Sequence, residues 1–332
     1  MESTEKKVRI NKYDNLKGLA IFLIVLGHLC FFDFIGISKL ISFIYIIHLP
    51  IFFFVSGYFS KIGINEPVKL FKRLIIPYLI FTIIYYIYFL QWGIATNIPF
   101  LVPTYALWFL LVIFFMKLLL PIFDKFRYPI LMALIIAILF GFINLKLDFL
   151  GFKRFFVFLP IYLIGFYYND YKQKVLENYR KIYDFLENKI ILILISIVVL
   201  SFSIYIAFTV PFELITMKYP YTNHYLYNML ARFSIIAIGI ISTLILNRIM
   251  IDKECFLTKW GRNSMTVYLL HIFVTKFLEK NAMNWFDNGL IALIFAFLLA
   301  TLIVYIFSRD IFTKYLNLLT DDVANLVLDK KE

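Results

Sequence analysis

Long apolar segments follow one another along almost the whole chain, and short polar or charged stretches separate them. About ten of these segments have the length that a helix needs to cross the hydrocarbon core of a bilayer. We place them at about residues 17–36, 41–60, 74–92, 105–123, 129–145, 155–169, 189–209, 227–247, 264–281 and 289–308, with residues 144–154 turning outside the membrane. The pattern predicts an all-α integral membrane protein, a bundle of about ten transmembrane helices in a single domain over residues 1–332.

Lysine and arginine are distributed unevenly between the two sets of loops that these segments define. If the N-terminus is inside, the interior segments contain 25 of the 33 basic residues, whereas the exterior turns contain seven. Short loops rich in lysine and arginine remain on the cytoplasmic side of a membrane. The N-terminal segment 1–16 and the tail 309–332 are therefore both predicted to be cytoplasmic, in a multi-pass protein of the cell membrane.

Composition supports this interpretation and limits the partners. The chain is 62% hydrophobic and 16% charged, whereas soluble domains carry about 25% charged residues. The formal charge of +12 is mostly explained by cytoplasmic loops and their attraction to anionic lipid. Because this charge is divided among short loops without a recognition motif, we predict no nucleic-acid partner. Cys30 and Cys255 are predicted to lie on opposite membrane faces, and no metal-ligand spacing occurs.

A lysine and a histidine, Lys17 and His28, lie in the first segment on one predicted helical stripe. Their spacing of eleven residues corresponds to about three turns and about 16 Å of rise. A titratable side chain inside a membrane is costly unless it faces a polar cavity, which makes His28 a functional candidate. The alternatives are a histidine hydrogen-bonded between helices and a lysine that extends to the headgroups. Asp14 fits an N-cap, a partner that orients Lys17, or a ligand-binding group.

The second segment contains two further polar candidates, His48 and Ser56. His48 precedes Pro50 by two residues, and proline suits the first turn of a helix. His48 is therefore predicted to lie near the outer face, where an acceptor would approach. Ser56, which precedes Gly57, either permits close helix packing or lines a cavity as a hydrogen-bond donor.

Later segments contain two arginines and a histidine that are candidates for the same cavity. Arg154 lies at the outer start of the sixth segment, and Arg232 lies inside the eighth. A buried arginine needs a carboxylate, a phosphate or a set of carbonyls, and no membrane-embedded carboxylate is evident for Arg232. This favours a solvated or ligand-filled cavity, with Glu213 from the outer loop as the alternative partner. In the ninth segment Ser264 resembles an N-cap, and His271 is either a packed interhelical histidine or a cavity residue.

Basic residues at the cytoplasmic ends of the segments point to a donor that carries phosphate. Lys17, Lys72, Arg73 and Arg262 are predicted to meet such a donor at the cytoplasmic mouth of a path across the membrane. His28, deeper on the same face, suits the role of general base for a hydroxyl or of a transient acyl carrier. Composition and spacing alone do not identify the donor or the acceptor.

Several short sequence blocks in a fixed order carry a resemblance to a known family. They are Tyr13-Asp14-Asn15-Leu16-Lys17-Gly18 with Val25-Leu26-Gly27-His28, His48-Leu-Pro-Ile-Phe-Phe-Phe-Val-Ser56-Gly57-Tyr58, Arg73-Leu-Ile-Ile-Pro77-Tyr78, Leu107-Trp108-Phe109, Arg154 through Pro160 to Gly165, and Gly261-Arg262-Asn263-Ser264 through Tyr268 to His271. The set resembles the acyltransferase family 3 membrane proteins, most closely the fucose 4-O-acetylase-like branch. His28 and Lys17 match the family's first-helix histidine and basic residue, although most members have arginine at the position of Lys17.

The resemblance implies transfer of an acyl group, usually acetyl from acetyl-CoA, to a sugar hydroxyl of a cell-surface glycan such as exopolysaccharide, capsule or cell-wall glycan. It implies acetyl-CoA as a substrate rather than a permanently bound cofactor, and the cytoplasmic membrane of a prokaryote as the location. A glycan acceptor, membrane lipid and glycan-assembly proteins are the expected partners. The alternative is a polysaccharide transporter or export factor, but the internal repeats common in transporters are not evident. A receptor would need a ligand domain that the sequence does not show.

Overall fold

The computed structural model describes residues 9–32, 34–63, 66–93, 100–145 and 148–328, and the outermost parts of the predicted cytoplasmic segments lie outside these ranges. Within them all regular structure is helical. The elements are α1 (Asn11–Leu29), α2 (Ile35–Tyr58), α3 (Glu66–Leu70), the π-helix η1 (Phe71–Ile75), α4 (Ile76–Leu90), η2 (Tyr105–Leu107), α5 (Trp108–Phe123), α6 (Pro129–Leu139), η3 (Phe140–Phe142), η4 (Phe149–Gly151), α7 (Phe152–Phe166), α8 (Tyr168–Asn178), α9 (Arg180–Glu187), α10 (Lys189–Thr209), α11 (Phe212–Ile215), α12 (Tyr225–Ile249), α13 (Phe256–Arg262), α14 (Ser264–Asn281), α15 (Gly289–Phe307) and α16 (Asp310–Val327).

Seven helical segments in this part of the chain are long and apolar enough to cross a membrane. They are Ile35–Tyr58, Pro67–Leu90, Tyr105–Phe123, Phe149–Phe166, Lys189–Thr209, Tyr225–Ile249 and Gly289–Phe307. The other three predicted segments are helices as well, but they differ in a physical way. α6 and the turn that follows it form a shorter apolar helix, whereas α1 and α14 each carry several charged side chains. The helices of the predicted bundle are confirmed, and seven of them have the composition of a membrane span.

The start of α1 is polar and still helical, because its polar side chains bond to the connection between α12 and α13. The Asn15 amide donates to the backbone carbonyls of Ile251 and Lys253 at 2.9 and 3.0 Å. Thr258 donates to the Asn15 side-chain oxygen at 2.5 Å. For this reason α1 begins six residues before the predicted span 17–36; it also ends earlier than predicted, at Leu29.

Two pairs of glycines bring helices into backbone contact. A Cβ atom on Gly18 of α1 would lie 2.1 Å from the carbonyl oxygen of Leu257 in α13, and one on Gly261 of α13 would lie 1.7 Å from that of Asp14. Gly57 of α2 and Gly165 of α7 make an equivalent reciprocal contact. Only glycine permits such an approach. These crossings fix α1 against α13 and α2 against α7.

Pro50 lies inside α2, because this helix begins at Ile35. The prediction that Pro50 opens a helix was therefore wrong. A Cβ on Gly239 of α12 would lie 2.7 Å from the Pro50 ring, so the bulk of the proline is accommodated by a glycine on the neighbouring helix. His48 consequently lies in the middle of a long helix rather than at its outer start.

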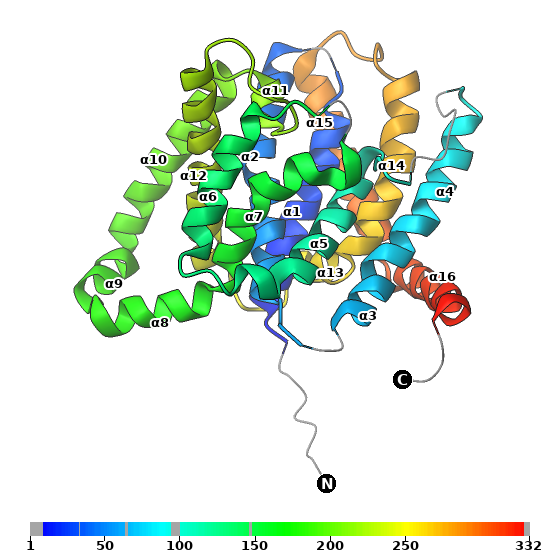
Figure 1. Cartoon of the computed structure of the whole chain (residues 1–332). Helices are drawn as coiled ribbons and strands as arrows, with labels where there is room; N and C mark the ends of the chain where they lie inside the picture. The colour runs from blue at the N-terminus through cyan, green and yellow to red at the C-terminus, as the bar shows by residue number, and fades with distance from the viewer. Residues whose placement is uncertain (1–8, 33, 64–65, 94–99, 146–147, 329–332) are drawn as a thin grey trace.

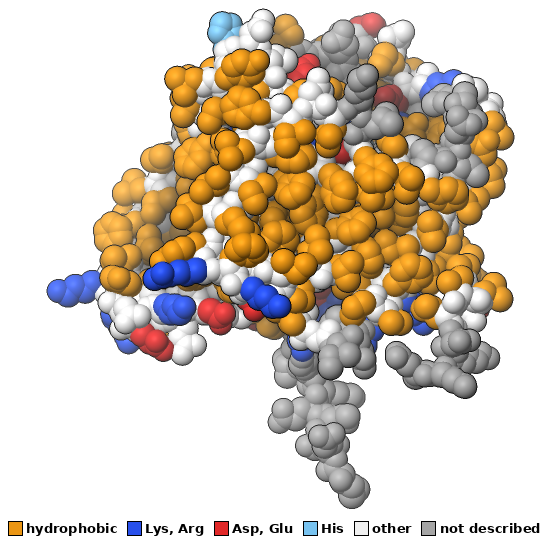
Figure 2. Space-filling view, in the orientation of Figure 1, with side chains coloured by type: hydrophobic (Ala, Val, Ile, Leu, Met, Phe, Trp, Pro, Cys, Tyr) orange, Lys and Arg blue, Asp and Glu red, His pale blue; other side chains and the backbone are white. Residues whose placement is uncertain are grey.

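The helices form a bundle with two distinct ends (Figure 1). α3, α8, α13 and α16 lie at one end, which we call the α16 end, and α11 lies at the opposite, α11 end. The first turn of α1 and the last turn of α16 are both at the α16 end. Figure 2 shows hydrophobic side chains across the middle of one face and lysine and arginine side chains gathered along its lower edge. An apolar belt with a basic rim is the surface that a bilayer-embedded protein presents.

Candidate active site

Two cavities meet inside the bundle. The first, of about 460 Å³, opens toward α11 and is lined by His28 and His48, so we call it the histidine cavity. The second, of about 570 Å³, lies between η1, α5 and α16 and is lined by several lysines and arginines, so we call it the basic cavity. Five residues line both and form the point of contact, which we call the waist: Lys17, Phe52, Ser56, Phe109 and Met265.

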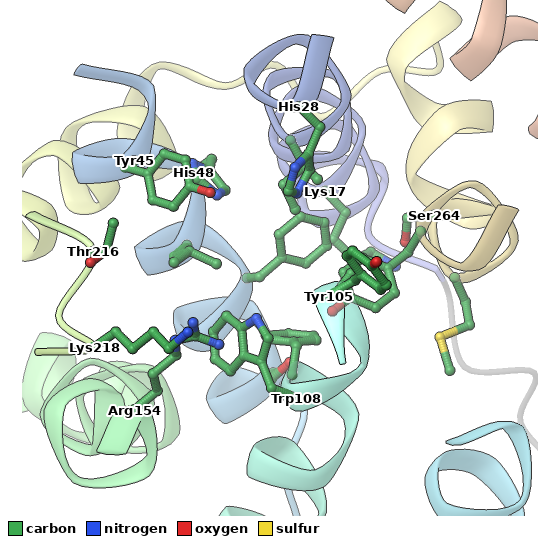
Figure 3. Close-up of a pocket in the computed structure, with 18 of the residues that line it drawn as sticks. Lys17, His28, Tyr45, His48, Tyr105, Trp108, Arg154, Thr216, Lys218 and Ser264 are labelled. Atoms are coloured by element: carbon green, nitrogen blue, oxygen red, sulfur yellow. The ribbon is translucent and has the colours of Figure 1, made fainter. Parts of the chain in front are cut away.

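Side chains from several helices point into the histidine cavity (Figure 3). The labelled ones are Lys17, His28, Tyr45, His48, Tyr105, Trp108, Arg154, Thr216, Lys218 and Ser264. Lys17 and His28 both line this cavity, so the prediction that they share one stripe of α1 is confirmed. The predicted residues His48, Ser56 and Arg154 are found there too.

His28 lies in the last turn of α1 and is half-buried. Within the described residues neither of its ring nitrogens forms a hydrogen bond, and the side chain lines the cavity. His48 differs, because its Nδ1 lies 2.6 Å from the carbonyl oxygen of Ile44. A carbonyl only accepts, so the Nδ1 of His48 donates and its Nε2 is left as the acceptor.

A cluster of charges fixes Lys17 at the waist. The Lys17 ammonium lies 2.8 Å from the buried Asp14 carboxylate. Asp14 also binds Arg9 at 2.5 Å and lies 3.7 Å from Nε of Arg262. The hydrogen bond with Asp14 raises the pKa of Arg9. Ile10 is the N-cap of α1, so the N-cap interpretation of Asp14 was wrong and its contact with Lys17 is the observed one.

Arg154 is held by a partner that the sequence did not reveal. Its guanidinium lies 3.7 Å from the buried carboxylate of Asp148 and 4.2 Å from the centre of the Trp108 ring. Stacking on tryptophan and pairing with a carboxylate both suit the planar guanidinium. This arrangement leaves a flat aromatic and cationic surface on one wall of the histidine cavity.

The basic cavity contains the π-helix η1, which carries Lys72 and Arg73. Pro77 lies four residues after Arg73 and has no N–H to donate to the Arg73 carbonyl, so the regular α-helical bond is lost there. The chain widens into a π turn at this place, a feature found often at functional sites. Lys72 also forms an ion pair with Asp321 of α16 at 3.1 Å.

Two further cations line the basic cavity. Lys117 of α5 donates to the side chain of Ser60 at 2.7 Å and to the carbonyl of Ser56 at 3.2 Å. Arg262 donates to Glu254 at 2.8 Å and to the side chain of Asn11 at 3.0 Å. The predicted donor-binding residues Lys17, Lys72, Arg73 and Arg262 are thus brought together, although Arg262 is already occupied by protein groups.

Two predicted cavity residues line neither cavity. Arg232 is buried in α12, donates to the carbonyls of Tyr219 at 3.0 Å and Ala137 at 3.5 Å, and stacks on Tyr221. Its two terminal nitrogens bond to carbonyls, whereas its buried Nε has no hydrogen-bond partner among the described residues, and neither of the two cavities includes it. His271 is fully buried behind the cavity wall. Ser264 lines the histidine cavity, whereas the N-cap of α14 is Asn263.

Sequence reasoning missed Lys117 and Lys276 as cavity residues. Lys117 lies inside α5 among apolar residues. A lone charge in an apolar run is itself a signal of function, and that signal was available. Lys276 pairs with Glu279 and lies 5.3 Å from the Tyr105 ring centre, a position that only the packing of α14 reveals.

Comparison with known proteins identifies the chain at the level of a family. The family model described as an acyltransferase domain, Acyl_transf_3, matches residues 10–309. The chain belongs to the acyltransferase 3 family. No curated protein and no solved structure gave a match. The prediction of an enzyme that transfers an acyl group within a membrane is confirmed, and the family implies an acyl donor and an acyl acceptor. The fucose 4-O-acetylase-like branch stays a prediction.

Proposed function

We propose that this acyltransferase 3 protein moves an acetyl group from acetyl-CoA in the basic cavity to a sugar hydroxyl in the histidine cavity. The observation that carries the proposal is the waist, where a cavity rich in cations and a cavity with an unpaired histidine share Lys17 and Ser56. Two substrates that enter from opposite ends can meet only through the waist. The acceptor would be a cell-surface or lipid-linked glycan, as in the fucose 4-O-acetylase-like branch.

The basic cavity suits the phosphates of coenzyme A. Among the described residues, six lysine or arginine side chains and one aspartate line it. Lys72 and Arg73 are the strongest candidates for phosphate contacts, since charge-assisted bonds to phosphate are strong and the ion pair of Lys72 with Asp321 is exposed and easily exchanged. Glu254 and Asn11 already bind Arg262, so we assign Arg262 to holding Asp14 rather than to a phosphate contact.

The chemistry beside His28 follows from which atoms are available. The acceptor hydroxyl gives its proton to a free ring nitrogen of His28 while its oxygen attacks the thioester carbonyl, forming the new C–O bond. The C–S bond then breaks, and the coenzyme A thiolate takes the proton back from His28. Lys17, fixed by Asp14 at the waist about 16 Å of helical rise from His28, binds the donor through a phosphate while the acyl end extends past the waist. His28 thus acts as a base in this scheme rather than as an acyl carrier.

The histidine cavity suits a sugar. Tyr45, Tyr105, Trp108 and Tyr268 contribute aromatic walls, and Arg154 adds a cation with free donors beside Trp108. Aromatic faces pack against the apolar faces of sugar rings, while arginine bonds hydroxyls or the phosphate of a lipid-linked precursor. With the α16 end in the cytoplasm, as the lysine and arginine distribution favours, acetyl-CoA would enter from the cytoplasm and glycan from outside, in a prokaryotic cytoplasmic membrane.

Mass spectrometry of surface glycans from a deletion strain tests the function. We expect glycan of normal length and amount that lacks one acetyl substituent, restored by the wild-type chain but not by a His28→Ala chain. A polysaccharide exporter, the alternative function, predicts the opposite result: glycan that is missing from the surface and accumulates inside, with its acetylation unchanged.

Arg154→Ala should impair transfer to the acceptor without impairing binding of the donor. We expect transfer to glycan to fall roughly 10- to 100-fold, because bonds from a charged group contribute about 1.5–3 kcal/mol. Binding of labelled acetyl-CoA in detergent should stay near the wild-type value. Lys153→Ala is the matched control, since Lys153 is the neighbouring cation and lines neither cavity. An equal loss of donor binding in Arg154→Ala would place Arg154 in the donor site or the fold.

A further inference from the structure

A second histidine lies directly behind His28. His271 of α14 is fully buried, and its ring centre lies 5.3 Å from that of His28, with the planes 41° apart. Tyr268, one turn earlier, is the other ring beside it, at 6.1 Å. His271 therefore faces the candidate base from the side opposite the histidine cavity.

The protonation pattern of His271 follows from its backbone contact. Nδ1 lies 3.0 Å from the carbonyl oxygen of Val267. Since a carbonyl only accepts, Nδ1 carries the proton and Nε2 is an acceptor. Nε2 is buried and has no hydrogen-bond partner among the described residues. A buried, unpartnered acceptor is rare in folded proteins and calls for an explanation.

We propose that His271 is a positioning residue whose Nε2 accepts an N–H from His28. The proposal rests on the proposed function, in which His28 is the base. Such a bond would hold His28 in the tautomer whose other nitrogen is unprotonated and faces the cavity. His271 itself exchanges no proton: the proton of the acceptor hydroxyl passes to His28 and then to the coenzyme A thiolate.

The observed geometry suits this role. No hydrogen bond joins the two rings in this structure, but catalytic hydrogen bonds are commonly long without substrate and shorten when substrate is bound. The packing of α1 against α14 brings the two rings to 5.3 Å, and the bond from Nδ1 to Val267 leaves Nε2 as the free acceptor of His271. A histidine base oriented by a second group is a general arrangement in enzymes that activate a hydroxyl.

Replacement of His271 by glutamine and by asparagine tests the proposal. Glutamine keeps a polar atom near the position of Nε2, whereas asparagine keeps one only near Nδ1. We expect His271→Gln to retain most of the kcat for acetyl transfer and His271→Asn to lose roughly 100-fold. The KM for acetyl-CoA should stay unchanged in both, since His271 lines neither cavity.

Two comparisons make the result decisive. Thermal unfolding in detergent is measured for both variants, and activity is compared only as the kcat of His271→Gln divided by the kcat of His271→Asn. A ratio near one, or a higher rate in His271→Asn, would overturn the positioning role. His28→Ala is assayed in parallel: if it transfers acetyl normally, the proposed function itself fails, whereas an inactive His28→Ala with a ratio near one refutes only the role of His271.

Discussion

Replacing His28 with alanine should abolish acetyl transfer while leaving folded protein in the membrane. His28 is half-buried, lines the histidine cavity, and has two ring nitrogens without a hydrogen-bond partner among the residues that the structure describes. Removing a general base costs about 100- to 10,000-fold in rate, and we expect a loss in this range. The measurement is transfer of labelled acetyl from acetyl-CoA by purified protein in vesicles that contain the glycan.

The matched control is His224→Asn. His224 is an exposed histidine at the N-cap of α12 with a positive φ of 67°, which asparagine tolerates. This variant should keep full activity. Normal transfer by His28→Ala would remove His28 from the chemistry. An acetyl group found on His28 after incubation with donor alone would instead support the acyl-carrier mechanism over the base.

Lys17→Ala should be the second most damaging change. Lys17 lies where the cavities meet, and Asp14 fixes its ammonium at 2.8 Å. A charge-assisted bond to a donor phosphate contributes about 1.5–3 kcal/mol, which is up to roughly 100-fold in affinity. We therefore expect a large rise in the KM for acetyl-CoA. Lys17→Arg should retain most activity, since the charge and the ion pair with Asp14 are kept.

Lys12→Ala is the control for Lys17, because Lys12 lies on the same helix and lines neither cavity. It should transfer acetyl at the wild-type rate. Equal losses in Lys17→Ala and Lys17→Arg would indicate a role that only lysine can perform, such as donating a proton. A fall in the single-turnover rate at saturating acetyl-CoA, with donor binding unchanged, would move Lys17 from the phosphate site to the reacting carbonyl.

Much of the helical framework was predictable, because membrane segments are defined locally. Apolar length alone places the segments that correspond to α2, α5, α10 and α15. Periodicity alone places Lys17 and His28 on one stripe. The error at the start of α1 arose because Asn15 is satisfied by carbonyls more than 230 residues away, an interaction with no local sequence signal.

The candidate site was predictable only for residues whose type and position are informative without knowledge of their contacts. A histidine in an apolar segment is informative by itself, so His28 and His48 were found. The interaction partners of a side chain can be identified only in the packed structure. Asp148 beside Arg154, and the carbonyls around Arg232, depend on how loops and neighbouring helices fold back, and sequence cannot distinguish an arginine bound by carbonyls from one that awaits a ligand.

The waist also matters for the electrical integrity of the membrane. Two water-filled cavities that opened on opposite sides of the membrane and joined freely would let ions flow down their gradient through the protein. Three of the five shared side chains, Phe52, Phe109 and Met265, are apolar, and Lys17 adds a positive charge at the same level. Hydrophobic constrictions exclude water, and a fixed cation repels protons and metal ions. In the proposed arrangement, the same few side chains that bring an acetyl group within reach of both substrates thus also prevent ions from passing through the protein and dissipating the membrane potential.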